Sequence, residues 1–230
     1  MEAIILAGGK AERLGDAAGG RPKALVEVAG TPLAGYQVRR LVSAGVDRVI
    51  VSCASGQGPF FQAALAGLGA EIAVAEEPER LGRGGGIKFA ARLRQSSGDI
   101  YALNGDELVD VDFSALLARH REAGGAATLT VARPKSQFGL VDVDETDVVH
   151  GFREDTQVPY WVNCGNYVLA EEAIERFPDR GDHESTTFPE LADEGRLHAY
   201  RHAGLWLTVN TPKELRVAIE HVAAHPEWLA

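Results

Sequence analysis

The chain has 230 residues, of which 45% are hydrophobic and 24% are charged, and it can therefore bury one substantial core within a single domain spanning 1–230. Its formal net charge of -10 at pH 7 repels the phosphates of nucleic acids and anionic membranes, which excludes a general affinity for either partner. A strand pattern follows Met1 directly, and no apolar run approaches the roughly 20 residues that span a bilayer, so we expect a cytoplasmic protein without a signal peptide.

Strand and helix patterns alternate through the first half of the chain. Buried strands are expected at 3–7, 48–52, 71–74 and 99–103. Helices are expected from Thr31 to the residues before Gly45, at 60–68, and at 87–93 after a run of three glycines. Such β-α-β alternation predicts a parallel sheet that is covered by helices on both faces.

The second half is less regular and adds hairpins to this frame. Strands are expected at 127–132, 139–143, 148–149, 160–169 and 205–209, with a turn at 144–147. Helices are expected at 115–121, where Asp112 precedes the start, and at 212–224. The fold class is therefore α/β, a Rossmann-like three-layer sandwich with a mixed, mostly parallel sheet.

The first predicted strand runs into a glycine pair, and two cations follow along the chain. The loop consists of Leu6, Ala7, Gly8, Gly9 and Lys10. Glycines allow backbone N–H groups to approach a phosphate closely, and Arg13 and Lys23 would neutralise the charge of a triphosphate. The loop is neither G-x-G-x-x-G nor a Walker P-loop, which disfavours a dinucleotide dehydrogenase or an ordinary ATPase.

A candidate metal ligand follows another predicted strand. Asn104, Gly105 and Asp106 come directly after residues 99–103, and the carboxyl ends of strands form the ligand crevice of an open α/β sheet. A carboxylate there suits Mg²⁺, which takes a few protein oxygens and completes its shell with water and phosphate oxygens. The two cysteines, Cys53 and Cys164, have no metal-ligand spacing and are expected to be small buried residues.

The first loop resembles that of a known family. The arrangement L-A-G-G-x-x-x-R-L followed by P-K is similar to the signature of the sugar-1-phosphate nucleotidylyltransferases, which join a nucleoside triphosphate to a sugar phosphate and release pyrophosphate. The segments L-G-R-G-G-G-I-K and N-G-D-E-L-V-D-V-D look most like heptose-1-phosphate and cyclitol-phosphate guanylyltransferases. The resemblance implies a nucleotide-binding half at about 1–110, a sugar-binding half at about 111–230, and Arg13 and Lys23 as catalytic cations.

The same resemblance implies which residues contact each substrate. The nucleotide is assigned to Leu6, Ala7, Gly8, Gly9, Lys10, Glu77, Gly82, Gly84, Gly85, Asn104 and Gly105, and the sugar to Gly139, Glu154 and Asn163. The glycines after residue 81 are expected to let a flat base lie against the backbone. Asp155 stands where the family commonly has the lysine that grips the sugar phosphate, and Arg153 or Arg201 are the candidate replacements.

The second metal position departs from the family pattern. Many relatives have W-x-D-V-G-T-P near the C-terminus, whereas this chain has Thr208 in the place of the aspartate. The resemblance to N-acetylglucosamine-1-phosphate uridylyltransferases implies that Asn210 joins Asp106 as a Mg²⁺ ligand. The alternative is that Asn210 and Thr211 cap the last helix, with Thr211 as the cap, and the two roles are compatible.

The expected reaction is transfer of a nucleotidyl group from an NTP, with GTP favoured, to a sugar or cyclitol 1-phosphate, with Mg²⁺ as cofactor. Uridylyl, thymidylyl and cytidylyl transfer are alternatives. Departures from the family at Ala11, Thr208 and Asp155 leave open a nucleotide-sugar binding or regulatory protein without turnover. No G-x-S-x-G motif accompanies the seven histidines, which disfavours a hydrolase. We expect no nucleic-acid or membrane partner, and a homodimer is left open.

Overall fold

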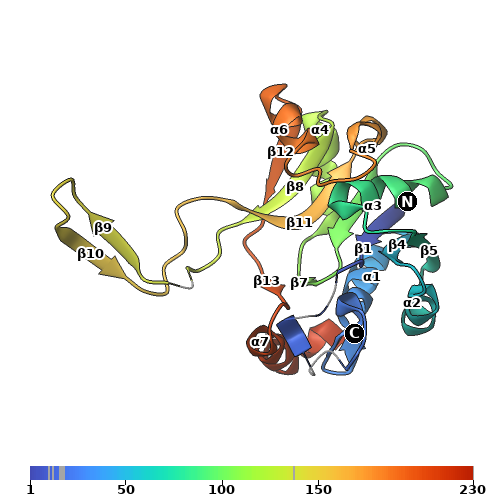
Figure 1. Cartoon of the computed structure of the whole chain (residues 1–230), viewed down its shortest axis with the longest axis horizontal. Helices are drawn as coiled ribbons and strands as arrows, with labels where there is room; N and C mark the ends of the chain where they lie inside the picture. The colour runs from blue at the N-terminus through green and yellow to red at the C-terminus, as the bar shows by residue number, and fades with distance from the viewer. Residues whose placement is uncertain (10, 12, 16–18, 137, 230) are drawn as a thin grey trace.

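A seven-stranded sheet forms the middle of three layers in the computed structural model, which describes residues 1–9, 11, 13–15, 19–136 and 138–229 (Figure 1). From one edge to the other, the strands are β12 (Leu197–Arg201), β8 (Ala127–Ala132), β11 (Val162–Leu169), β6 (Ile100–Asn104), β1 (Glu2–Leu6), β4 (Arg48–Ala54) and β5 (Glu71–Glu77). β11 runs antiparallel to both of its neighbours, and the other pairs run parallel. The mixed, mostly parallel sheet of the prediction is confirmed.

Helices cover both faces of this sheet. One face carries α1 (Leu33–Ser43), α2 (Gly58–Leu65) and α4 (Phe113–Ala123), and the other carries α3 (Gly82–Ala90), α5 (Glu171–Arg176) and α6 (Thr187–Asp193). Successive side chains of β1 point to opposite faces of the sheet. Ile5 therefore packs in the hydrophobic core under the first set of helices, and Ile4 packs in the core under the second set. Both side chains are fully buried.

A third apolar cluster holds the long loop after β1 against the C-terminal helix. Leu14 and Val28 from the loop region pack with Ala218 and Val222 of α7 (Pro212–Ala224). The smaller elements are β2 (Glu27–Val28), β3 (Thr31–Pro32), β7 (Glu107–Val109), β13 (Trp206–Thr208) and the 3₁₀ turns Lys23–Leu25, Ala91–Leu93 and Pro226–Leu229. β7 pairs with β13, which brings the approach to α7 beside the segment after β6.

A β-hairpin projects away from these layers. It consists of β9 (Leu140–Val143) and β10 (Val149–Arg153), which leave the sheet between β8 and β11 (Figure 1). Residues 138–155, which include both strands, are called the arm below. The segments 133–136 and 156–161, which join the arm to the sheet, are called its root.

Several elements differ from the sequence prediction. α3 begins at Gly82, two residues before the run of three glycines, rather than at residue 87. β12, α5 and α6 were not predicted, because each is short and half exposed and shows no long apolar period. Cys53 and Cys164 are buried and unpaired as predicted. Among the described residues, each helix is either too short or too polar to cross a lipid bilayer.

Candidate functional site

The carboxyl ends of β1 and β6 meet at one point of the sheet edge. Leu6 pairs with Asn104, and the Gly105 amide donates to the Leu6 carbonyl at 2.9 Å. A Cβ at position 105 would lie 2.7 Å from that carbonyl oxygen, so only glycine permits this close approach. The turn after β6 is thereby held beside the glycine loop after β1.

A cavity of about 230 Å³ opens at this junction. Its lining comprises Leu6, Ala7, Gly8, Gly9, Lys23, Ala24, Glu77, Arg80, Gly82, Arg83, Asn104, Gly105 and Asp106. Residues assigned to the nucleotide, to catalysis and to the metal, from four separate segments of the sequence, therefore surround one space. Arg80 and Arg83 were not among the predicted site residues, although both belong to the segment that resembles the family's base-binding loop.

The predicted cations and oxygen ligands form one cluster at this cavity. Lys23 Nζ donates to the carboxylate of Asp106 and, at 2.5 Å, to Asn210 Oδ1. Arg13 also donates to Asn210 Oδ1, at 3.2 Å. Lys23 is only 8% exposed, so its charge is largely withdrawn from water and depends on these partners.

Local structure explains how Asn210 reaches this cluster. Thr211 caps α7 by accepting from the Glu214 amide, and Glu214 in turn accepts from the backbone of Asn210 and Thr211. The side chain of Asn210 takes no part in the cap and turns to Lys23. In addition, the Val209 amide donates to the Asp106 carbonyl at 3.1 Å, which ties the two segments together.

The donor chemistry of this cluster fits a hard divalent cation. Asp106 and Asn210 each direct a side-chain oxygen at the same ammonium group, so two oxygens already converge on one positive charge. Among the described residues, no group of three or more His, Cys, Asp or Glu side chains could hold a metal ion. A Mg²⁺ ion would therefore take most of its ligands from phosphate and water, as this ion commonly does.

A second carboxyl group lies directly behind Asp106. Glu107 is 6% exposed, and Asn166 Nδ2 lies 3.4 Å from its Oε2. Burial, followed by the proximity of Asp106, raises the pKa of Glu107 well above its ordinary value, which favours the neutral acid. Sequence reasoning missed Glu107, although its place directly after Asp106, at the start of an apolar segment, was a usable signal.

Glu77 shapes the cavity wall by holding the start of α3. Its carboxylate accepts from the Leu81 amide at 3.0 Å and from the Ser52 hydroxyl at 2.8 Å. Gly82 follows with a φ of 79°, a backbone conformation that side chains with a Cβ rarely adopt. Glu77 therefore acts on the loop that would meet a base, and it also lines the cavity itself.

The next glycines are buried on the other side of α3. A Cβ at Gly85 would lie 2.5 Å from the Asp179 carbonyl oxygen, and one at Gly84 would lie 2.8 Å from the backbone nitrogen of His183. Neither residue lines the cavity, although both were assigned to the nucleotide. Their missing side chains instead allow the segment 178–183 to lie directly against the helix.

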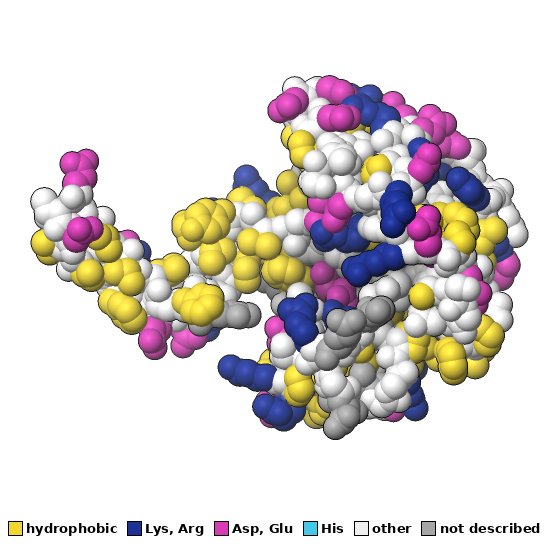
Figure 2. Space-filling model, viewed as in Figure 1, with side chains coloured by type: hydrophobic (Ala, Val, Ile, Leu, Met, Phe, Trp, Pro, Cys, Tyr) yellow, Lys and Arg dark blue, Asp and Glu magenta, His cyan; other side chains and the backbone are white. Residues whose placement is uncertain are grey.

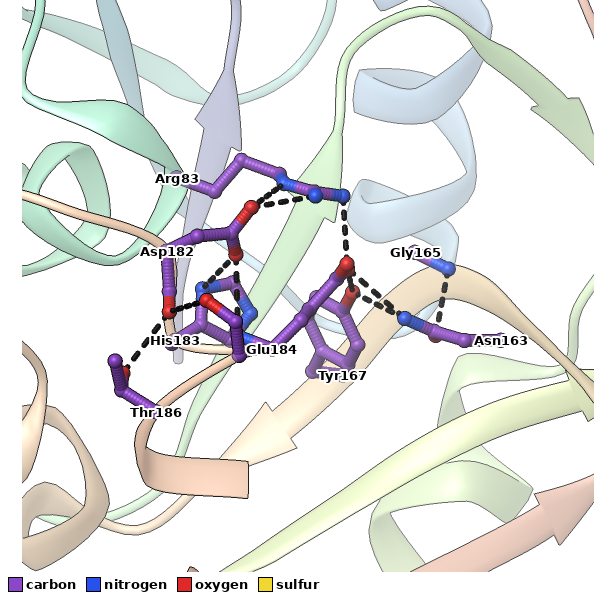
Figure 3. Close-up of polar contacts among 9 residues, drawn as sticks. Arg83, Asn163, Gly165, Tyr167, Asp182, His183, Glu184 and Thr186 are labelled. Atoms are coloured by element: carbon purple, nitrogen blue, oxygen red, sulfur yellow. Dashed lines mark hydrogen bonds and ion pairs between the residues drawn. The ribbon is translucent and has the colours of Figure 1, made fainter. Parts of the chain in front are cut away.

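A polar network joins this segment to Asn163, which is assigned to the sugar (Figure 3). Arg83 donates to Asp182 at 2.8 Å and pairs with Glu184 at 2.7 Å. Burial lowers the pKa of Arg83, but Glu184 and Asp182 outweigh it and raise the pKa above its ordinary value. Glu184 also accepts from Asn163 Nδ2 at 3.0 Å and from the Tyr167 hydroxyl at 2.8 Å.

Asn163, assigned to the sugar, is largely occupied by its own neighbours. Its amide nitrogen donates to Glu184 and, at 2.9 Å, to Tyr167, while its oxygen accepts from the Gly165 amide at 3.0 Å. Both amide hydrogens are therefore used within the protein. The Asn163 side chain and the Tyr167 hydroxyl hold Oε1 of Glu184, and Arg83 pairs with its Oε2, so this carboxylate is also engaged within the protein.

None of the three residues assigned to the sugar is among the described residues that line the cavity. Gly139 and Glu154 lie on the arm, as does Asp155, and neither Gly139 nor Glu154 is among the cavity-lining residues. Arg153 forms an ion pair with Asp142 on the arm, and the guanidinium group of Arg201 lies over the ring of Trp161 at the root. Lys10, assigned to the nucleotide, and Glu12 lie outside the described residues.

Comparison with protein families gives a match to the family described as nucleotidyl transferase over residues 2–225. The chain belongs to this family. Its curated relatives include a mannose-1-phosphate guanylyltransferase of Mycobacterium tuberculosis, 33% identical over 227 residues that cover 93% of the chain and 62% of the relative. The mannose-1-phosphate guanylyltransferase catalytic subunit beta of Xenopus tropicalis is 30% identical over 245 residues, covering 100% of the chain and 68% of the relative. The chain thus spans about two thirds of their length.

Solved structures support the fold of the chain. HddC from Yersinia pseudotuberculosis superposes with a TM-score of 0.75 at 23% identity, covering 96% of the chain and 98% of HddC. A UTP-bound UGPase from Acinetobacter baumannii superposes with a TM-score of 0.76 at 21% identity, covering 99% and 95%. The predicted family resemblance and the α/β fold class are both confirmed.

Proposed function

We propose that the chain transfers a nucleotidyl group from GTP to the phosphate of a sugar or cyclitol 1-phosphate and releases pyrophosphate. The observation that carries this proposal is the convergence of Lys23, Asp106 and Asn210 at the cavity beside the glycine loop. GTP is favoured because curated relatives are named mannose-1-phosphate guanylyltransferases and because HddC was solved in complex with GMP-PN.

The reaction is an in-line displacement at the α-phosphorus of the nucleotide. A phosphate oxygen of the acceptor forms the new P–O bond, the bond to the β-phosphate bridging oxygen breaks, and pyrophosphate carries the electron pair away. The acceptor phosphate is already ionised, so no protein nucleophile is required. The contribution of the chain is to position both substrates and to neutralise their charge.

Individual side chains divide this work. The exposed backbone at Gly8 and Gly9 borders the cavity where the triphosphate would lie, and Lys23 and Arg13 would donate to its oxygens. When Lys23 turns to phosphate, the oxygens of Asp106 and Asn210 become free to hold Mg²⁺. The ion, when bound, neutralises developing charge on the phosphate oxygens.

Pyrophosphate release from GTP and a panel of sugar and cyclitol 1-phosphates tests the proposal. Lys23→Ala and Asp106→Ala should each lower kcat by at least about a hundredfold, because electrostatic groups that act on the transition state contribute on this scale. Lys213→Ala, an exposed lysine on α7, is the matched control and should retain full activity. Near-normal turnover in either site variant, with its thermal melt intact, would refute the assignment.

A binding protein without turnover is the second candidate. It is favoured by Thr208, which lies on β13 where relatives have a metal-ligating aspartate, and by the remote position of Asp155 on the arm. A binder would be stabilised against heat by a nucleotide sugar and would release no pyrophosphate with any acceptor. UTP, dTTP and CTP belong in the same panel, because no contact of the described residues selects a base.

A further inference from the structure

The strands of the arm form no strand pairing with the rest of the described chain. Among the described residues, β9 and β10 pair only with each other and belong to no larger sheet. The arm stands clear of the three layers (Figure 1). An isolated two-stranded hairpin is marginally stable in water and needs a further surface to pack against.

One face of the arm is apolar and exposed. The strand register places Val141 opposite Phe152 and Val143 opposite Val149, so these four side chains share a face. They are 45%, 64%, 54% and 56% exposed, respectively. The opposite face carries the ion pair of Asp142 with Arg153, at 2.6 Å. Figure 2 shows apolar side chains along the arm, far from the body of the molecule. Such a patch is typical of a protein–protein contact.

The root holds the arm in its outward direction. The Ser136 amide donates to the Thr156 carbonyl at 2.9 Å, and the Val158 amide donates to the Pro134 carbonyl at 3.0 Å. In addition, the guanidinium groups of Arg133 and Arg201 lie 4.7 and 5.2 Å from the ring of Trp161. Folding the arm back over the crevice of its own chain would require breaking these contacts.

Charge on the arm is complementary to charge at the root. Residues 138–155 contain six acidic side chains and one arginine. At the root edge, Arg133, Lys135 and Arg201 make no ion pair with any described carboxylate. The arm points away from these cations in its own chain, but the arm of a two-fold related copy would approach them. This self-complementary arrangement is what a symmetric dimer requires.

We propose that two copies of the chain exchange arms, so that each arm packs its apolar face on the root of the second copy. The inference rests on the proposed function in one respect, because it brings Glu154 and Gly139 to the crevice of that copy, beside its Asn163. The three residues assigned to the sugar are thereby collected in trans. Arm and root together supply roughly the 20–30 residues that one side of a standard interface uses.

The mass of the protein in solution tests the exchange without reference to activity. Light scattering after gel filtration should give twice the 24.6 kDa of one chain. The double variant Val143→Ser/Phe152→Ser should give the mass of one chain. Phe60→Ser is the matched control, because Phe60 on α2 is 60% exposed against 64% for Phe152, and this variant should stay dimeric. A monomeric wild-type protein, or a dimer that survives the double substitution, would overturn the proposal.

Complementation of two inactive variants tests whether the sites are shared. Lys23→Ala removes a cation from the body, and Glu154→Ala removes a carboxylate from the arm. Each variant alone should lose activity, and their co-expression should restore about one quarter of the wild-type activity, because half of randomly assorted dimers would contain one complete site of two. No restoration, or full activity of Glu154→Ala alone, would show that the arm serves no second site.

If the wild type releases no pyrophosphate with any acceptor, the proposed function fails, and the mass measurement still decides whether arms are exchanged.

Discussion

His183 should make the stability of the protein depend on pH. The ring is fully buried, stacks on Phe177 at 4.7 Å between centroids, and meets Phe188 edge-on at 4.6 Å. Neither ring nitrogen has a hydrogen-bond partner among the described residues. Two charged groups act on it, Asp182 at 3.9 Å from Nδ1 and Arg83, and their effects on the pKa are opposite.

The magnitude follows from the pKa of this ring. Burial, which disfavours the charged form, lowers the pKa of His183 from 6.5 to about 4. Because the unfolded chain keeps the higher value, it binds the proton first as the pH falls. The free energy of unfolding should therefore fall by about 3 kcal/mol between pH 6.5 and pH 4, and the contribution is fully preserved above pH 6.5.

His183→Phe isolates this contribution, since phenylalanine keeps a flat ring in the aromatic stack and does not titrate. Urea unfolding at pH 7 and at pH 4.5 should show the variant gaining most of about 3 kcal/mol relative to wild type at the lower pH, equivalent to a Tm difference of several degrees. Other acid-sensitive groups are common to both proteins and cancel in the comparison. His225→Gln, at an exposed histidine, is the control. A difference between wild type and His183→Phe that stays constant with pH would refute the reasoning.

Three further changes have defined outcomes. Gly85→Ala should destabilise the protein by about 1–3 kcal/mol in urea unfolding, because its Cβ would meet a backbone oxygen at 2.5 Å, whereas Gly9→Ala, with 4.0 Å to the nearest atom, should not. Asp112→Ala removes the cap that accepts from the Ala115 amide at the start of α4 and should cost about 1 kcal/mol, read as a lower Tm, with Ser114→Ala as a neutral control. Asn210→Asp adds a carboxylate to the oxygen pair and should lower the Mg²⁺ concentration for half-maximal pyrophosphate release by about tenfold; an unchanged requirement would argue against a metal at this position.

The fold was predictable for the buried strands, where continuous apolar residues supply side chains to both faces of the sheet. Ile4 and Ile5 alternate between two cores, and Ile50 between Val49 and Val51 repeats the pattern on β4. The prediction missed β12, because Leu197–Arg201 lies at the sheet edge, where two of its five residues are exposed and the other three are only partly buried. An exposed edge strand has no continuous apolar run, so single-sequence periodicity carries little information there.

The candidate site was predictable to the extent that strand ends meet. Asp106 and the glycine loop share an edge because β1 and β6 run parallel and are neighbours; the parallel direction follows from the β-α-β pattern, whereas the strand order comes from the structure. The contact of Gly85 with Asp179 was not predictable, since these residues are far apart in the sequence and the segment 178–183 has no regular structure. The glycine run was therefore explained by the ligand alone, whereas packing between two segments also requires it.

Two residues of the arm that are assigned to the sugar differ in how the structure explains them. Gly139 was assigned to the sugar from its motif, yet a Cβ at this position would lie 2.5 Å from the ring of Phe152, so a larger residue would have to displace that exposed ring. Glu154 is exposed and has no comparable structural reason. If the arms are exchanged, the carboxylate should therefore matter for turnover with the sugar phosphate, while Gly139→Ala should act mainly through the shape of the arm and through the dimer it forms. Comparing the mass in solution and the kcat of Gly139→Ala with those of Glu154→Ala separates the two roles, and loss of the dimer in Glu154→Ala would contradict them.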